Sequence, residues 1–512
     1  MCFKCFKCYI QYFRSVKKLK KVVSLNYDKE DPIMKETIVL PIFFTDKLNI
    51  YTLGIILATL TIFIVFVNST NTLPLLLLLF QPAHAQLLGN LTNLSNNTGF
   101  SSNPQITTFE SDVYVVWRDN SSGNDDIYFS ASADNGTSFN SIKNLSNNVG
   151  RSDNPQIAAE GDNVYVVWTD NSSGRDQIYF KRSSDKGNLF YPTEDLSNNN
   201  GSSTHPQITA IGNSVYIVWS DTTTGNGDIY FKSSANNGTS FASLKNLSRN
   251  LNGSAHFPQV EATGNNIYVV WRDETADRGG IRFRASNDNG NNFNITRVLS
   301  QKNDMNANSP QLAASGNTVY IVWEDNSRSG NSNSSKNFDL LFRVSTNGGS
   351  NFTNTKILTK NPGDSFDPQT AISGENMYAV WEDNTAGEGT SLNWEVRFRG
   401  ILYNGANTTD TKILSENTSE VADYQQIAAS ETKLYVVWSG LYIRTYPGIF
   451  DIFFTVSNDE GKNFSQAINL SNNQGNSILP RIATSQDNGY IVWSDTTTGN
   501  GDIYFRSVID GQ

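Results

Sequence analysis

A five-residue apolar run that ends in tryptophan recurs eight times along the chain. The copies read VYVVW, VYVVW, VYIVW, IYVVW, VYIVW, MYAVW, LYVVW and GYIVW. Their tryptophans are Trp117, Trp168, Trp219, Trp271, Trp323, Trp381, Trp438 and Trp493. Successive tryptophans lie 51, 51, 52, 52, 58, 57 and 55 residues apart. Self-similarity at this period indicates a propeller or a solenoid.

Each repeat contains four short segments with the character of β-strands. In residues 155–197 they are PQIAAEG, NVYVVWTD, QIYFKRS and a segment that runs from Phe190 to DLS. The second and third segments are β-branched and aromatic on both faces, so neighbouring units must cover both faces. Turns rich in Gly, Asn, Asp and Ser separate the segments. A solenoid coil would need a shorter period and a sandwich domain more strands, so the pattern favours four-stranded propeller blades.

The two ends of the repeat region complement each other. The eighth unit stops at DIYFRSVIDGQ, after its third strand, while NLTNLSNN near residue 90 matches the fourth strand KNLSNN of other units. Pairing these segments would close the ring and remove its open edges. We therefore predict an all-β fold, a single closed propeller of eight four-stranded blades with the N-terminal strand in the last blade. Seven blades are the fallback.

Residues 1–85 differ from the rest of the chain. They carry ten basic and five acidic residues, all three cysteines (Cys2, Cys5 and Cys8), and an uncharged stretch from Leu48 to Ala85. The spacing of the cysteines could suggest a metal site, but a fourth ligand is missing. The apolar run and Ala83-His84-Ala85 predict a signal peptide cleaved before Gln86, with an uncleaved membrane anchor as the alternative. Met34 is an alternative start. We expect residues 86–512 to be one exported domain, secreted or at the cell surface.

The charge of the exported part limits its partners. The whole chain has a net charge of −10, so residues 86–512 carry −15 once the +5 of the leader is removed. This charge opposes binding to nucleic acid or anionic lipid. Eighteen Asn-x-Ser/Thr sequons follow residue 86, and we expect some of them to be glycosylated in an exported protein.

A second motif, Ser-x-Asp-x-Gly-x-x-Phe, falls between the third and fourth strands of six units. Its copies are SADNGTSF, SSDKGNLF, SANNGTSF, SNDNGNNF, STNGGSNF and SNDEGKNF. They resemble the Asp-box of sialidases and related propellers, and the Trp-containing units resemble secreted archaeal and bacterial sialidase-like proteins. The resemblance covers residues 86–512. It implies a hairpin turn on the face opposite an active site.

The residues of this motif support a structural role independently. Gly136 suits positive φ in a tight turn, Ser132 and Asp134 can bond the turn's own backbone, and Phe139 can bury its ring between blades. Asp185, Asp288 and Asp459 repeat Asp134, but Asn236 and Asn347 replace it elsewhere. An amide still accepts a hydrogen bond but cannot serve as a general acid. We therefore interpret the motif as a turn.

Two other sets of loops should form the opposite face, which we call the loop face. One set leads into each first strand and ends in Pro-Gln, and the other joins the second and third strands. For the repeated glutamines we favour hydrogen bonding between blades over ligand binding. Aspartates in the second set, with Asp221 and Asp228 as the best pair, are weak candidates for Ca²⁺, but their spacing matches no known calcium loop. We predict no cofactor, with calcium as the open alternative.

The motifs of a working sialidase are incomplete. The resemblance implies three arginines, a Tyr nucleophile assisted by Glu, and an Asp acid/base, yet the Phe/Tyr-Arg-Ile-Pro sequence is absent. We therefore predict a non-catalytic module that binds glycan or protein at the cell surface, and the sequence leaves catalysis open. The alternative is an exoglycosidase that cleaves terminal sialic-acid-type sugars.

A ligand site should lie where units depart from their consensus on the loop face. Arg481 replaces the repeated Gln, and Tyr424 replaces the usual residue before Pro-Gln, in a unit that reads Gln425-Gln426 instead. The loop LYIRTYPGIF replaces an Asp/Gly turn with Tyr442, Arg444 and Tyr446. Aromatic and guanidinium groups stack on sugars and hold carboxylates. These five residues are our candidates for ligand binding.

Overall fold

The computed structural model describes two parts of the chain. In residues 1–84 it describes the strands β1 (Tyr9–Phe13), β2 (Lys20–Ser24) and β3 (Val39–Pro41), which form an antiparallel sheet. In the second part it describes residues 87–249, 253–275, 279–301, 306–327, 337–385, 394–416, 418, 421–442 and 448–509. Within these ranges no helix is long and apolar enough to cross a membrane. The apolar run Thr52–Val67 lies outside them, so the predicted leader stays a prediction.

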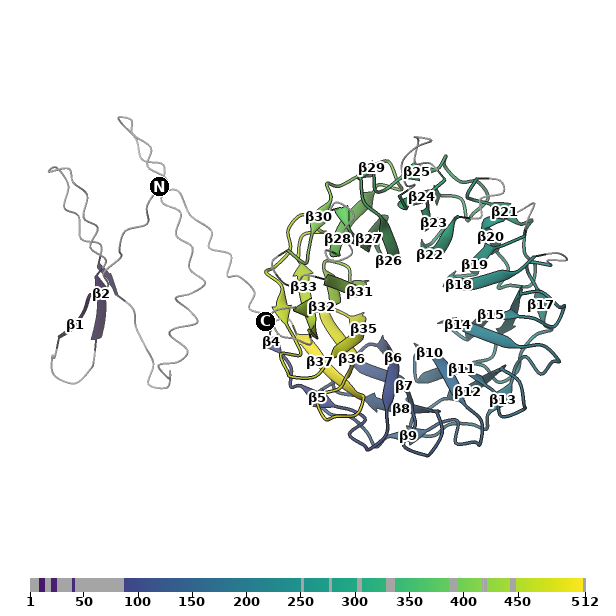
Figure 1. The fold of residues 1–512 in the computed structure, drawn as a ribbon, viewed down its shortest axis with the longest axis horizontal. Helices are drawn as coiled ribbons and strands as arrows, with labels where there is room; N and C mark the ends of the chain where they lie inside the picture. Colours follow the sequence, from purple (N-terminus) through teal and green to yellow (C-terminus); the bar gives the residue numbers. More distant parts are fainter. Residues whose placement is uncertain are drawn as a thin grey trace. The chain divides into compact units, whose positions relative to one another are not determined.

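The second part is a ring of eight antiparallel sheets around a central opening (Figure 1). Each sheet is one blade, and blades are numbered here in chain order. The first strand of each blade lies innermost, and the others follow outward in sequence order. The predicted eight-bladed propeller is therefore confirmed.

The strands recur with nearly constant bounds. The first strands are β6 (Ser101–Phe109), β10 (Ser152–Glu160), β14 (Ser203–Ile211), β18 (Ala255–Thr263), β22 (Asn308–Ser315), β26 (Ser365–Ser373), β31 (Val421–Ala429) and β35 (Ser477–Ser485). The second strands, which carry the tryptophans, are β7 (Asp112–Asp119), β11 (Asn163–Asp170), β15 (Ser214–Asp221), β19 (Asn266–Asp273), β23 (Thr318–Asp325), β27 (Asn376–Asp383), β32 (Leu434–Tyr442) and β36 (Asn488–Asp495).

The outer strands are the third and the much shorter fourth of each blade. The third strands are β8 (Asp126–Ser132), β12 (Gln177–Ser183), β16 (Asp228–Ser234), β20 (Gly280–Ser286), β24 (Asp339–Ser345), β28 (Glu395–Leu402), β33 (Ile449–Ser457) and β37 (Asp502–Ile509). The fourth are β9 (Lys143–Asn144), β13 (Glu194–Asp195), β17 (Lys245–Asn246), β21 (Arg297–Val298), β25 (Lys356–Ile357), β29 (Asn407–Thr408) with β30 (Lys412–Ile413), and β34 (Ile468–Asn469).

The eighth blade takes its outermost strands from the other end of the domain. β4 (Leu87–Leu88) and β5 (Thr92–Asn93) both pair with β37, with Val508 opposite Leu88 and Tyr504 opposite Asn93. Leu94 is buried beside Trp117, so the N-terminal segment also packs on blade 1. The predicted closure of the ring is confirmed.

A tryptophan–aspartate pair secures the end of most second strands. In blade 1, Trp117 Nε1 donates to Asp119 Oδ2 at 3.2 Å, and Ser101 Oγ donates to the same oxygen at 2.6 Å. All eight tryptophans of the repeat are fully buried. Burial alone would raise the pKa of Asp119, but hydrogen bonds from Ser101, Ser121 and Asn97 outweigh it and lower that pKa. The aspartate therefore stays ionised inside the blade and ties three loop segments together.

The Ser-x-Asp-x-Gly-x-x-Phe segments are turns in all six copies. In blade 1, Ser132 Oγ donates to Asp134 Oδ1 at 2.7 Å and accepts from Gly136 N at 2.9 Å. Phe139 packs edge-on against Phe505 of blade 8 at 4.8 Å. In blade 3, Asn236 Oδ1 accepts from Ser234 Oγ at 2.8 Å, the same bond with an amide oxygen. We call the face that carries these turns the turn face.

The turn allows a direct comparison of two substitutions. Asp134→Asn should change the free energy of unfolding by less than about 0.5 kcal/mol, because the amide in blade 3 makes the same bond. Gly136→Val should cost about 1–3 kcal/mol, because φ is +76° there and a Cβ would lie 2.4 Å from Phe505 Cζ. Urea unfolding of both variants tests this, and equal effects would contradict the turn interpretation.

Candidate functional site

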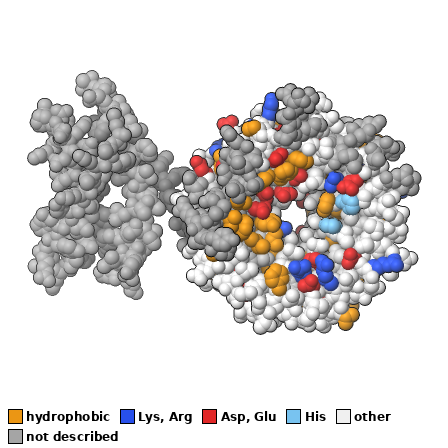
Figure 2. All heavy atoms as spheres, viewed as in Figure 1, with side chains coloured by type: hydrophobic (Ala, Val, Ile, Leu, Met, Phe, Trp, Pro, Cys, Tyr) orange, Lys and Arg blue, Asp and Glu red, His pale blue; other side chains and the backbone are white. Residues whose placement is uncertain are grey.

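The loop face is built from the ends of strands that meet at one edge of each blade. In blade 2, Ser152 at the start of the first strand lies opposite Asp170, which ends the second strand and pairs with Gln177. Figure 2 shows acidic, basic, histidine and hydrophobic side chains gathered around the central opening. The side chains around the mouth of the channel thus differ in chemistry between parts of the ring, although the blades themselves are repeats.

One position in each first strand has an unusual backbone. The register of every first strand shifts by one bulge near its start, and the residue in that bulge has a positive φ between 45° and 56°. These eight residues, the mouth ring, are Asn103, Asn154, His205, Phe257, Ser309, Asp367, Tyr424 and Leu479. No glycine occupies this position, although glycine would adopt the backbone without strain. Phe257 is 45% exposed and Tyr424 is 41% exposed. The bulge therefore presents Asn from blades 1 and 2 and a different side chain from each of the other six blades.

A cavity of about 180 Å³ lies among the inner strands of blades 8, 1 and 2. Its walls include Arg481 and Leu479 from β35, Asn103 and Gln105 from β6, and Asn154 and Gln156 from β10. Burial lowers the pKa of Arg481, whose Nη1 donates to Pro480 O at 3.2 Å. No carboxylate lines the cavity. The cavity therefore combines one guanidinium group with neutral amides, a set that can bind an anionic or hydroxyl-rich ligand.

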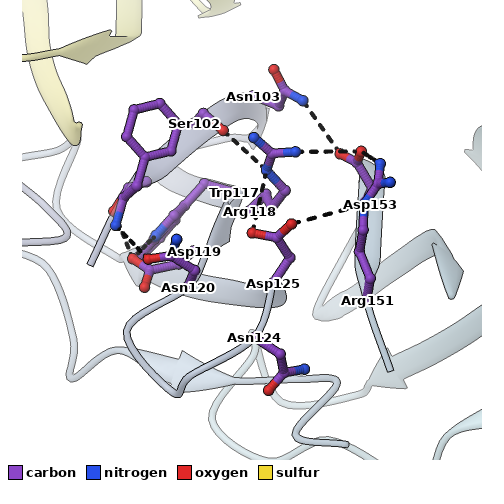
Figure 3. Close-up of polar contacts among 12 residues, drawn as sticks. Ser102, Asn103, Trp117, Arg118, Asp119, Asn120, Asn124, Asp125, Arg151 and Asp153 are labelled. Carbon is purple, nitrogen blue, oxygen red and sulfur yellow. Dashed lines mark hydrogen bonds and ion pairs between the residues drawn. The ribbon is translucent and has the colours of Figure 1, made fainter. Parts of the chain in front are cut away.

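An ion network stands beside this cavity, between blades 1 and 2 (Figure 3). Arg118 Nη1 lies 3.5 Å from Asp153 Oδ2, and Arg118 Nε lies 3.9 Å from Asp125 Oδ1. Arg151 also contacts both aspartates (Figure 3). Asp153 Oδ1 accepts from the Nδ2 group of Asn103 at 3.3 Å, which fixes one amide of the cavity wall. The two arginines are thus neutralised by two aspartates and serve to position Asn103.

An acidic sector occupies the mouth at blades 5 to 7. Glu324 Oε1 accepts from Asp367 N at 2.7 Å, and Glu382 Oε1 accepts from Tyr424 N at 3.2 Å. Burial raises the pKa of Glu324 to about 7. Burial, together with the hydrogen bond and charge of Asp423, strongly raises the pKa of Glu382. Each glutamate thus caps the mouth-ring residue of the next blade.

The structure places the predicted ligand residues as follows. Arg481 and Tyr424 lie in the inner strands of neighbouring blades 8 and 7, but Tyr424 does not line the Arg481 cavity. Arg444 and Tyr446 lie outside the described residues, and of Tyr442 only the backbone at the end of β32 is described. A site shared by all of them stays a prediction.

The aspartates considered for calcium are engaged in the protein's own bonds. Asp221 accepts from Asn199, Ser203, Trp219 and the amide of Thr223. Asp228 accepts from Thr224, Asn246 and Ser248. Across the described ranges no group of three or more His, Cys, Asp or Glu side chains could hold a metal ion. A calcium site at these residues stays a prediction.

Hydrogen bonding of the repeated glutamines between blades stays a prediction. These glutamines are Gln105, Gln156, Gln207, Gln259, Gln311, Gln369 and Gln426. Gln105 and Gln156 line the cavity beside Arg481. Sequence reasoning also missed the acidic sector and the mouth ring. The available signal was the variable residue that precedes Pro-Gln inside an otherwise repeated segment.

No protein-family model and no curated protein matches the sequence. Among solved structures, the polysaccharide lyase Uly1 is 8% identical with a TM-score of 0.47, over 69% of this chain and 89% of that one. The phage phi92 endosialidase is 10% identical with a TM-score of 0.40, over 83% and 69%. The intramolecular trans-sialidase from Ruminococcus gnavus is 10% identical with a TM-score of 0.37, over 81% and 95%. The structural neighbours thus include sialidase propellers, and similarity this low concerns the fold alone.

Proposed function

We propose that the propeller is an exported or cell-surface member of the Asp-box class that binds glycan or protein without cleaving it. The observation that carries this proposal is the Arg481 cavity. A single guanidinium group replaces the repeated Gln there, and the surrounding walls supply the amides of Asn103, Gln105, Asn154 and Gln156. Amides donate and accept hydrogen bonds with sugar hydroxyls, and the guanidinium group can hold a carboxylate in a bidentate manner.

The expected ligand is a glycan that carries an acidic sugar. The exported domain has a strongly negative net charge, so long-range attraction would not concentrate such a ligand at its surface. Recognition would instead rest on short-range contacts inside the cavity, where burial of the guanidinium group strengthens a charged hydrogen bond. Moderate affinity and weak dependence on salt follow from that arrangement.

A second function, sialidase-like hydrolysis, is favoured by one observation. Tyr424 and Glu382 are neighbours, because the amide of Tyr424 donates to the glutamate. Burial and the nearby charge of Asp423 raise the pKa of the Tyr424 phenol, however. The raised pKa of Glu382 likewise leaves its carboxyl protonated and unable to accept the phenolic proton. The arginines nearest the cavity, Arg118 and Arg151, are paired with aspartates. Binding therefore accounts for the geometry better than catalysis.

The first test is Arg481→Gln, which restores the residue found in seven other blades. We expect the binding of oligosaccharides that end in sialic or uronic acid to weaken by at least about tenfold, the cost of one charge-assisted hydrogen bond. Isothermal titration calorimetry measures this, with Lys462→Gln on the turn face as a control for loss of one positive charge. Equal binding by both variants would exclude Arg481 from the site.

The same preparations decide between binding and hydrolysis. A panel of fluorogenic sialosides should show no turnover. Turnover that disappears in Tyr424→Phe or in Arg481→Gln would overturn the non-catalytic proposal and support the glycosidase.

A further inference from the structure

A second cavity, of about 300 Å³, lies at the seam between blades 4 and 5, away from the mouth of the channel. Its walls include Thr296, Arg297 and Val298 from the outer edge of blade 4, and Arg343 and Asn351 from blade 5. No carboxylate lines it. In a domain with a net charge of −15, a cavity walled by two guanidinium groups and no acid is an exception that the repeat alone does not require.

Arg297 is the less constrained of the two arginines. Its backbone is fixed because β21 pairs with β20, with Arg297 opposite Phe283. Its Nε atom is buried and has no hydrogen-bond partner among the described residues. A buried N–H group without an acceptor costs free energy. Arg343 is held differently, since its Nε donates to Thr355 Oγ1 at 2.9 Å. The cavity thus contains an oriented donor that lacks its acceptor.

The turn of blade 5 contributes a second donor through a change in sequence. In blades 4 and 7 the Asn at the equivalent position donates its side chain to the turn aspartate, as Asn292 does to Asp288 Oδ2 and Asn463 to Asp459 Oδ2, both at 2.8 Å. In blade 5 Asn347 replaces that aspartate, and the backbone of Asn351 donates to Asn347 Oδ1 at 2.8 Å. The side-chain amide of Asn351 makes no hydrogen bond to a described residue.

The replacement of the aspartate therefore has two effects at the same cavity. It removes a carboxylate from the turn that borders the two arginines, and it leaves the Asn351 amide available to a ligand. Both effects favour an anion and disfavour a cation. Blade 3 also has Asn in the turn, but there Asn236 Nδ2 donates to Ser240 Oγ at 2.9 Å and closes the turn on itself.

We propose that the seam between blades 4 and 5 is an oxyanion site, in which Arg297, Arg343 and Asn351 bind a sulfate, phosphate or carboxylate group. The oxyanion would accept from the Nε group of Arg297 and from the amide of Asn351. This group can belong to a substituted sugar of the glycan bound by the protein or to a free inorganic ion. The site is separate from the Arg481 cavity and does not depend on it.

The test uses the full-length chain with sodium sulfate as the probe. Sulfate stabilises proteins in general by exclusion from their surface. Binding at the site is therefore measured by comparing, between variants, how much more stable each one is in sulfate than in chloride of equal ionic strength. Asn347→Asp restores the consensus turn, and we expect it to weaken sulfate binding by about tenfold while leaving stability in chloride unchanged or higher. Arg297→Gln should have a similar effect on sulfate binding.

Two controls separate the site from its surroundings. Lys245→Gln removes a positive charge at the equivalent position of blade 3, and Lys462→Gln removes one from the turn of blade 7. Both should leave sulfate binding intact. If Asn347→Asp and Arg297→Gln respond to sulfate as the unaltered chain does, the proposal is wrong. Tighter binding of a sulfated or uronic-acid disaccharide than of sulfate assigns the site to a glycan, whereas binding of sulfate alone assigns it to a free oxyanion.

Discussion

Removal of residues 86–98 is expected to lower the unfolding temperature of the entire propeller in one cooperative transition. The deleted segment supplies both outer strands of blade 8. It also supplies Ser95, whose Oγ donates to Asp502 Oδ1 at 2.8 Å and accepts from Ile503 N at 2.9 Å. Leu94, only 5% exposed, fills the space between Trp117 and Phe505. Burial of this leucine and the lost hydrogen bonds amount to about 5 kcal/mol, or about 5 °C in a domain of this size.

Differential scanning calorimetry measures the effect, and a truncated chain that melts unchanged would count against closure. Because the truncated chain could fail to fold, point variants give an independent measurement. Leu94→Ala and Leu145→Ala remove equivalent side chains, which are 5% and 2% exposed. Each should cost about 2–5 kcal/mol. A negligible cost for Leu94→Ala beside a large cost for Leu145→Ala would show that the N-terminal segment does not close the ring.

The second large effect is expected from Glu382→Gln, which should stabilise the protein at neutral and alkaline pH. Burial, together with the hydrogen bond and charge of Asp423, raises the pKa of Glu382 at the seam of blades 6 and 7, and the amide of Tyr424 donates to Asp423 Oδ1 at 2.6 Å. The folded pKa of Glu382 lies above its ordinary value of 4.5. Its contribution to stability is therefore complete below pH 4.5 and is lost as pH rises toward the folded pKa.

Gln keeps an oxygen for the amide of Tyr424 and adds an N–H donor for Asp423, so it replaces the protonated acid without the titration. We expect about 2 kcal/mol of stabilisation at pH 8 and a flatter decline of melting temperature between pH 5 and 8. The matched control is Glu431→Gln at an exposed position of the neighbouring blade 7. If Glu382→Gln lowers the melting temperature at pH 8, or leaves the slope as steep as the control, the raised pKa of Glu382 is refuted.

At low pH the dependence of stability on pH has the opposite sign, and stability falls as the pH is lowered. Asp119, Asp170 and Asp221 have folded pKa values below their ordinary value of 3.8, because hydrogen bonds from Ser, Asn and backbone donors outweigh burial. Their contribution is present above pH 3.8 and is lost as pH falls through the folded pKa. The unaltered protein should therefore be most stable in mildly acidic solution.

The fold was largely predictable because its signal is local and repeated. The VYVVW runs fixed the second strands, the interval between tryptophans fixed the number of blades, and the Asn-Leu-Ser copy at residues 93–95 revealed the closing strand. These features depend on contacts within one blade or between identical neighbours. A pattern that recurs eight times is therefore enough to predict these features, and no information on contacts between distant segments is needed.

The site was only partly predictable, for a corresponding reason. Arg481 stood out as a departure from the repeat, but its cavity depends on Asn103 and Asn154, which lie hundreds of residues away in the sequence. The pairing of Glu382 with the amide of Tyr424 requires the bulge in β31, and neighbouring residues in the sequence give no sign of that positive φ. The candidate residues at the mouth come from several blades. The repeat period does not show how those blades are oriented relative to one another.

The pairing of the first described strands of the ring with its last has a consequence for the order of events during synthesis. Blades 1 to 7 are each complete once their own fourth strand has left the ribosome, so they can assemble from the N-terminal side onward. Blade 8 cannot, because β37 emerges last and its partners β4 and β5 emerge first. Until β37 has emerged, residues 87–97 have no strand to pair with. Their mainly polar sequence, LLGNLTNLSNN, suits a segment that has to stay soluble. Closure should be the slowest step in forming the native ring, since it joins residues more than 400 positions apart.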